Sequence, residues 1–243
     1  MWASAGTRHD SIMSLSSSSR IAGRRVGILY IVGTLAGIVS VAALAPVTSA
    51  DHALQAVADS STRLSIAVLA VLTMGLALAM IPLVAYPVLR PHGSTLARGY
   101  IVFRSGLETV GYVLTAAGWL LLIPLSASVA ARADDSALAP LADGLLASEG
   151  VGSIGTVVFV IGAAMFYALL WRARLVPRWL TGWGLVALAA CLVGAVLTIL
   201  GVQESQSSAG VALAVPLALQ EMVLAVWLIV KGFREVPASV SSS

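Results

Sequence analysis

The sequence is short of charge, and this shortage excludes most soluble proteins. Charged side chains make up 10% of the 243 residues and hydrophobic ones 59%, whereas soluble domains carry about 25% charged residues. The mean hydropathy of +0.97 is typical of a chain embedded in lipid. No polar stretch is long enough to bury a soluble core of its own.

Groups that carry common chemistries are also scarce. The one cysteine, Cys191, lies in an apolar run, so the chain forms no intramolecular disulfide. The histidines, His9, His52 and His92, lie outside the apolar segments, which argues against haem or metal ligation within a membrane. The sequence also lacks a Ser–His or Asp–Asp pair at membrane depth, a phosphate-binding loop and arginines at every third position. We therefore predict no metal and no cofactor, and an intramembrane enzyme is the least supported class.

What the sequence does contain is six apolar segments, each about 20 residues or longer, the length that crosses a bilayer as a helix. They predict an all-α, polytopic membrane protein. We expect a bundle of six transmembrane helices at about residues 26–45, 64–89, 95–128, 151–171, 180–200 and 211–230. The transmembrane domain takes up residues 20–235, and the tails, residues 1–19 and 236–243, are predicted to be disordered. A short surface helix is expected within residues 138–147.

The first apolar segment has two further features. With Thr48-Ser49-Ala50 as a cleavage site it could be a signal peptide. Its roughly 20 apolar residues exceed the roughly 7–15 of secretory signals, so we interpret it as an uncleaved helix. Gly33 and Gly37 form a small-xxx-small pair, which lets another helix approach closely. Met1 and Met13 both stay candidates for the start of translation, because no structural pattern precedes Met13.

The charges of the connecting segments are asymmetric. The N-terminal arm, the second and fourth loops and the C-terminal tail hold eleven basic and two acidic residues, whereas the other three loops hold two basic and seven acidic ones. Because Lys and Arg accumulate on the cytoplasmic side, we predict a cell (plasma) membrane protein with both termini in the cytoplasm. The basic residues are spread over short loops rather than gathered in a patch, so we predict no nucleic-acid partner.

The third apolar segment contains two charged residues, Arg104 and Glu108, which a helix places on one face. Tyr112 and Thr115 continue this polar face. A charge near the centre of a membrane helix costs about 2.5–3.5 kcal/mol, so it persists where another group interacts with it. The sixth segment supplies Gln220-Glu221 at a similar depth, in the cytoplasmic half of the bilayer. We therefore expect the third and sixth helices to be neighbours, with Arg104 or Glu108 within reach of this pair.

Two carboxylates and one guanidinium leave an excess acid. A further arginine, Arg90, Arg172 or Arg174, could reach the site, or one glutamate could be protonated. Two interpretations stay open: a site for a ligand, ion or proton at Arg104, Glu108, Gln220 and Glu221, or a structural network in which Arg104 snorkels beside Glu108. The basic residues Arg90, Arg172, Arg174 and Arg178 are candidates for binding lipid headgroups, although topology anchors explain them as well. We interpret Tyr86 and Tyr167 as interface residues rather than site residues.

Several local motifs occur in a familiar order along most of the chain. They are Arg20-Ile21-Ala22-Gly23, Tyr86-Pro87-Val88-Leu89-Arg90, Gly99-Tyr100 followed by Phe103-Arg104 and Glu108, Arg174-Leu175-Val176-Pro177-Arg178-Trp179-Leu180 with Trp183-Gly184, and Gln220-Glu221 with Trp227-Leu228-Ile229-Val230-Lys231-Gly232-Phe233. In these motifs the chain resembles a bacterial family of uncharacterised six-helix membrane proteins, the domain of unknown function 4386 family. The resemblance implies a six-helix fold over roughly residues 20–235. It supplies no catalytic residues.

Two function classes follow from these observations. In the first, the protein handles a small solute, an ion or a lipid at the buried Arg/Glu site. In the second, it is a structural or partner-binding membrane protein whose buried charges only stabilise the bundle. The expected partners are the lipid bilayer, a small-molecule, ion or lipid ligand, and either a second copy of the chain or another membrane protein.

Overall fold

The computed structural model describes residues 4–50, 52–132, 139–146, 149–204 and 207–234, and all regular structure in these residues is helical. The elements in chain order are α1 (Ser4–Thr48), α2 (Ala53–Asp59), α3 (Ser61–Leu89), η1 (Arg90–His92), α4 (Ser94–Tyr100), η2 (Ile101–Glu108), α5 (Thr109–Arg132), α6 (Ala139–Leu146), α7 (Glu149–Ala173), α8 (Arg178–Ile199) and α9 (Ser208–Lys231).

Six of the described helices are long and apolar enough to cross a membrane. They cover Ser18–Thr48, Ser61–His92, Ser94–Ser128, Gly152–Ala173, Arg178–Ile199 and Ser208–Lys231. The predicted all-α fold with six spans is confirmed. Exposed apolar side chains cover much of the outer surface, for example Val41, Val186 and Leu200 at 68–72% exposure, which suits contact with lipid.

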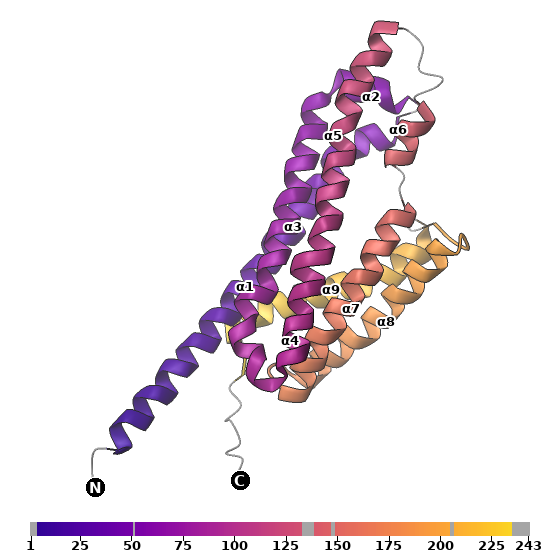
Figure 1. Ribbon diagram of the computed structural model, residues 1–243. Helices are drawn as coiled ribbons and strands as arrows, with labels where there is room; N and C mark the ends of the chain where they lie inside the picture. Colours follow the sequence, from indigo (N-terminus) through magenta and orange to yellow (C-terminus); the bar gives the residue numbers. More distant parts are fainter. Residues whose placement is uncertain (1–3, 51, 133–138, 147–148, 205–206, 235–243) are drawn as a thin grey trace.

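The N-terminal segment differs from expectation. α1 begins at Ser4, so residues 4–19, where the sequence predicts disorder, continue the first span as a helix that projects from the bundle (Figure 1). Extending an existing helix adds one hydrogen bond per residue without a new nucleus, which offsets the weak helix propensity of serine. The short helix expected within residues 138–147 is present as α6. The predicted C-terminal tail, residues 236–243, lies outside the described residues.

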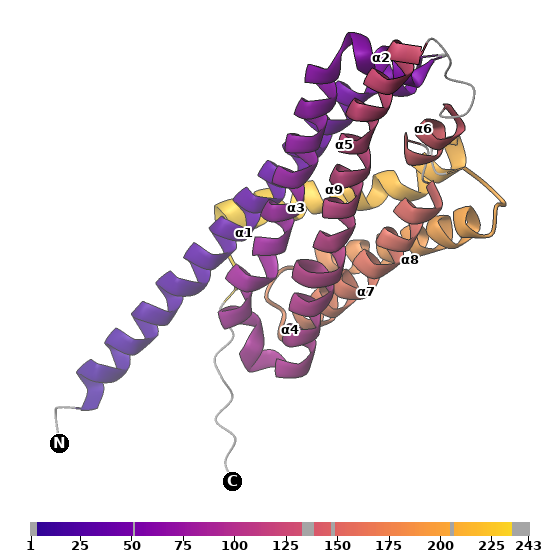
Figure 2. The ribbon, with the colours of Figure 1, turned by 45° about the horizontal axis from the view of Figure 1, so that its top comes forward.

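The spans form two groups that meet at one end, α1 with α3 and α7 with α8. The helix α9 lies against one member of each group, α1 and α8. The third span belongs to both groups, because α4 and η2 pack against α7 while α5 packs against α3 and α2. Figures 1 and 2 show α5 and α7 diverging from the end where α4 lies. We call this shared end the basic end, because Arg90, Arg172, Arg174 and Lys231 lie there.

The helices of the basic end form a dense core. The Tyr100 ring stacks on Phe166 with centroids 4.9 Å apart, and both rings are buried. The α1–α3 contact is equally close. A Cβ on Gly33 would lie 2.9 Å from the Leu78 side chain, and one on Gly37 would lie 2.9 Å from the sulfur of Met74. The glycine pair seen in the sequence therefore permits the close approach of these two helices.

Candidate functional site

The charged part of the third span is wound as a π-helix. Ile101–Glu108 forms the wide turns of η2, and such turns inside α-helices are frequent at functional sites. The Ser105 hydroxyl donates to the Ala79 carbonyl at 2.6 Å, which ties η2 to α3, and the Thr109 hydroxyl donates to the Arg104 carbonyl at 3.3 Å. These bonds hold the segment from which Arg104 and Glu108 project.

Arg104 joins the third span to the sixth. Its Nη1 donates to Oε2 of Glu108 at 3.1 Å, and its Nη2 lies 3.9 Å from Oε1 of Glu221. The guanidinium carbon lies 4.7 Å from the centroid of the Phe159 ring, a cation–π contact. Its Nε is buried without a hydrogen-bond partner in the described part of the chain. Arg104 lies within reach of Glu221, as expected. The expectation that the third and sixth helices are packing neighbours was wrong, because α9 packs against α1 and α8 whereas η2 and α5 pack against α3 and against α7 or α2.

Both oxygens of Glu108 are in use. Oε2 accepts from Arg104, and Oε1 accepts from the Tyr112 hydroxyl at 2.8 Å. The polar face predicted from the spacing of Arg104, Glu108 and Tyr112 is therefore confirmed. With side chains 2% and 5% exposed, Arg104 and Glu108 form a closed, nearly neutral pair.

Glu221 is in a different state. Its ion pair to Arg104, at 3.9 Å, is longer than a hydrogen bond. Its carboxylate accepts no hydrogen bond from the described residues, and its side chain is 19% exposed. The formal charge of Arg104, Glu108 and Glu221 together is −1. Of the two acids in this cluster, Glu221 is thus the one whose carboxylate has hydrogen-bonding capacity left.

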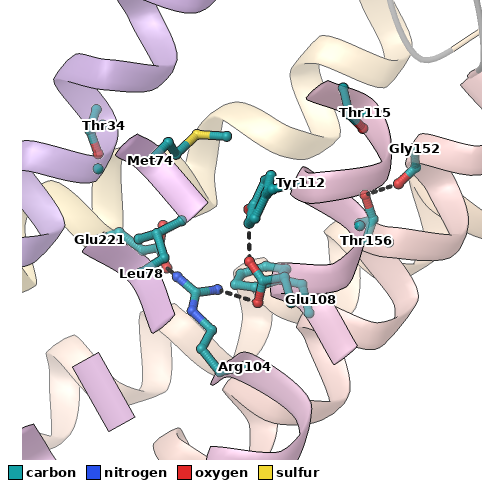
Figure 3. Close-up of a pocket in the computed structure, with 14 residues that line it drawn as sticks. Thr34, Met74, Leu78, Arg104, Glu108, Tyr112, Thr115, Gly152, Thr156 and Glu221 are labelled. Carbon is teal, nitrogen blue, oxygen red and sulfur yellow. Dashed lines mark hydrogen bonds and ion pairs between the residues drawn. The ribbon is translucent and has the colours of Figure 1, made fainter. Parts of the chain in front are cut away.

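A cavity of about 380 Å³ opens beside this cluster. Figure 3 shows Arg104, Glu108 and Glu221 turned toward one another at one side of it, with Met74, Tyr112 and Thr156 on the others. All spans except α8 contribute to the wall, which consists of Gly33, Thr34, Met74, Leu78, Arg104, Glu108, Gly111, Tyr112, Thr115, Gly152, Gly155, Thr156, Phe159 and Glu221. This volume lies in the range of small-molecule sites, roughly 300–1,000 Å³.

Three glycines in this wall face empty space. A Cβ built on Gly111, Gly152 or Gly155 would meet no atom within 4 Å. Sequence analysis missed these residues, and it missed Phe159 and Thr156. The sequence does place Gly152 and Gly155 three residues apart in one apolar helix. That spacing could not have predicted a cavity, because glycines with similar spacing also occur where two helices pack closely.

The match with a family model decides the classification. The model described as a domain of unknown function (DUF4386) matches residues 26–232, most of the chain. The chain belongs to the DUF4386 family. The family resemblance expected from the sequence is confirmed. Neither the comparison with curated proteins nor that with solved structures gave a match.

In this DUF4386 protein Gln220 lies apart from the cavity. Its Nε2 donates to the Leu180 carbonyl at 3.0 Å, and its Oε1 accepts from the Tyr167 hydroxyl. Gln220 is 0% exposed and Tyr167 only 1%, so the interpretation of Tyr167 as an interface residue was wrong. The Tyr167 ring packs over Gly184, where a larger side chain would exclude it. Gln220 and Tyr167 together join α9, α8 and α7.

The four arginines proposed for lipid headgroups are exposed at the basic end. The guanidinium of Arg178 lies 5.4 Å from the centroid of the Trp171 ring. Arg174 has a φ of 52°, the left-handed conformation in which a helix commonly ends. None of Arg90, Arg172, Arg174 or Arg178 lines the cavity or forms an ion pair with a described carboxylate. Their role at headgroups stays a prediction, and they do not neutralise Glu221.

The described residues of the DUF4386 chain contain no cluster of three or more His, Cys, Asp or Glu side chains that could hold a metal ion. The groups available in the cavity are the Glu221 carboxylate, which accepts no hydrogen bond from the described residues, the buried pair of Arg104 and Glu108, threonine hydroxyls and apolar surface. Groups of these kinds are able to bind and orient a small molecule.

Proposed function

We propose that this membrane protein handles a small ligand within the bilayer, in the cavity beside Arg104, Glu108 and Glu221. Glu221 is the group that meets the ligand, and Arg104 holds Glu221 in place. The observation that carries the proposal is the state of the Glu221 carboxylate. It accepts no hydrogen bond from the described residues and lines a cavity of about 380 Å³.

The energetics of buried carboxylates support this proposal. A buried charge without hydrogen-bonding partners costs several kcal/mol, so a carboxylate in this position calls for a partner. Glu108 is paired in this way, because Arg104 and Tyr112 occupy both of its oxygens. Glu221 lacks such partners, so a ligand group, an ion or a proton is needed to complete its surroundings.

A purely structural role is the alternative, and the closed contacts of Glu108 favour it for that part of the cluster. The two roles differ in what Glu221→Gln should do. Glutamine keeps the size and removes a charge that lipid disfavours, so folding should be kept in both cases. Only a ligand site loses binding.

The test uses purified full-length protein, with Glu204→Gln as the matched control. Glu204 is exposed and lies outside the cavity wall. Melting temperatures are recorded in detergent with a panel of small cations, anions, zwitterions and neutral solutes. We expect at least one compound to raise the melting temperature of the wild type and the control by several degrees, and to leave Glu221→Gln unchanged. If every stabilising compound acts equally on Glu221→Gln, the cluster is structural.

The orientation is part of the proposal. The charge asymmetry favours a basic end in the cytoplasm of a cell membrane protein, which would put Glu221 about 15 Å from the cytoplasmic ends of the helices. Cysteines placed at Ser94 and Ser207 in a Cys191→Ser background test it. In intact cells an impermeant thiol reagent should label position 207 and not position 94, and the reverse pattern would overturn the orientation.

A further inference from the structure

We infer that the ligand is an amphiphilic organic cation, an ammonium group on a single apolar chain, which enters from the lipid between α5 and α7. The inference rests on the proposed function and names its ligand class and its route. Charge, wall chemistry and the position of the opening support it separately.

The charge of the cluster selects a cation. Arg104 already contacts Glu108 and Glu221, and its unpartnered Nε is buried, so the cavity presents no free cationic group to an anion. The carboxylate of Glu221 faces the cavity, and the three side chains carry a formal charge of −1. An ammonium at Glu221 would restore neutrality and donate the hydrogen bonds that the carboxylate lacks.

The wall selects an organic cation over a metal ion. Hard cations such as Ca²⁺ take six to eight oxygen ligands, as a rule of thumb about 2.3–2.6 Å away. Beside the buried ion pair, the cavity supplies one carboxylate without a hydrogen bond from the described residues, three threonine hydroxyls and the Tyr112 hydroxyl that already donates to Glu108. The rest of its wall is made of glycines and the apolar side chains of Met74, Leu78 and Phe159, which leaves too few oxygen ligands for such an ion. Its volume of about 380 Å³ leaves room for an apolar chain beside the charged group.

The glycines that line the cavity on α5 and α7 indicate an opening between these two helices. Gly111 of α5 and Gly152 and Gly155 of α7 line the cavity and have empty space where a side chain would stand. Their neighbours Val110 and Ile154 are 55% and 58% exposed, as lipid-facing residues are. The two helices diverge here in both views (Figures 1 and 2). A chain dissolved in the bilayer therefore reaches Glu221 without crossing water.

The experiment measures binding of decylammonium to the full-length protein in lipid nanodiscs, with methylammonium, decanol and decanoate as comparison compounds. We expect decylammonium to bind at least tenfold more tightly than each of the other three, and Glu221→Gln to lose at least tenfold in affinity. Because a proton competes with the ammonium for the carboxylate, binding should weaken as the pH is lowered. Preferred binding of decanoate, or equal binding of decanol, would overturn the cation assignment.

The route is tested by filling the opening without touching a charge. Gly111→Leu and Gly155→Leu should each weaken decylammonium binding at least tenfold. Gly106→Leu is the control, because a side chain there also meets open space but lies outside the cavity wall. If a leucine variant fails to fold, Gly111→Ala and Gly155→Ala repeat the test with a smaller loss, about threefold. Unchanged affinity in the folded opening variants would refute the route.

The outcomes separate the two proposals. If methylammonium binds as tightly as decylammonium and Glu221→Gln abolishes both, the proposed function stands and the amphiphile inference falls. If no compound in either experiment depends on Glu221, both fall.

Discussion

The glycines of α1 and those of α5 and α7 lie in similar apolar helices but in opposite surroundings. A Cβ on Gly27 would lie 2.5 Å from the Ala225 carbonyl oxygen, and one on Gly23 would lie 2.7 Å from the Cα of Gly232. A Cβ on Gly111 or Gly155 would meet nothing within 4 Å. The same residue type thus brings two helices together in one region and leaves open space beside the cavity in the other.

The two regions also differ in how their polar groups are satisfied. In the close α1–α3 contact, the buried Ser40 hydroxyl donates to the Ala67 carbonyl at 3.0 Å. At the cavity, Glu221 accepts no hydrogen bond from the described residues. The close contacts therefore serve stability, and the cavity keeps a polar group free. Substitutions in the two regions should have different consequences.

The largest effect on stability is expected at Arg104, a buried residue that forms ion pairs with both Glu108 and Glu221. Arg104→Ala leaves Glu108 and Glu221 without their counter-charge, and breaking a buried pair in this way costs about 3–5 kcal/mol. We expect a large loss of folded protein and of melting temperature in detergent. Arg98→Ala, at an exposed position of the same span, is the control. Equal stability of the two variants would show that the cluster contributes nothing to the fold.

The next effect contrasts the two sets of glycines directly. Gly27→Ala forces the methyl group against the backbone of α9, and overpacking of this kind costs about 1–3 kcal/mol, occasionally more. Gly155→Ala adds the same methyl group to open space and should be neutral or stabilising by up to about 1 kcal/mol. Free energies of unfolding from denaturant titration check the pair. A similar loss in both would contradict the difference in packing.

The smallest effect is expected at Tyr167. Tyr167→Phe leaves Oε1 of Gln220 buried without its hydrogen bond, and an unsatisfied buried acceptor costs about 1–3 kcal/mol. We expect a loss in the lower half of this range, because Nε2 of Gln220 still donates to the Leu180 carbonyl. Tyr86→Phe is the control, since Tyr86 is only partly buried. Thermal unfolding should separate the two variants by a few degrees. Binding of decylammonium should be the same in both, because neither residue lines the cavity.

Sequence patterns predicted the features that depend on local order along the chain. Apolar length gave the six spans, and helical periodicity placed Arg104, Glu108 and Tyr112 on one face. Counting residues from the helix ends put Arg104 and Glu221 at a similar depth, and the two side chains do form an ion pair. Each of these features is set within one helix or by a residue's distance from the helix end. Counting residues along the sequence measures both.

Features that depend on how the helices are placed could not be predicted in this way. Gln220 and Glu221 are adjacent, yet one is fully bonded in the core and the other faces a cavity. Which of them faces which neighbour depends on the rotation of α9, and no local pattern reports that rotation. The cavity itself arises from absent side chains at Gly111, Gly152 and Gly155, which become a space only because α5 and α7 diverge.

The π-helix of the third span has a consequence for rotational phase. An α-helix turns about 100° per residue, and a π turn takes up one residue more than an α turn. The two halves of the span are therefore out of phase, so that Tyr100 stacks on Phe166 of α7 while Tyr112 packs over Gly75 of α3. Removing one residue, such as Gly106, would bring the halves back into phase and turn one of these tyrosines away from its partner. The divergence of α5 from α7 thus depends on the number of residues in this segment as well as on which residues they are.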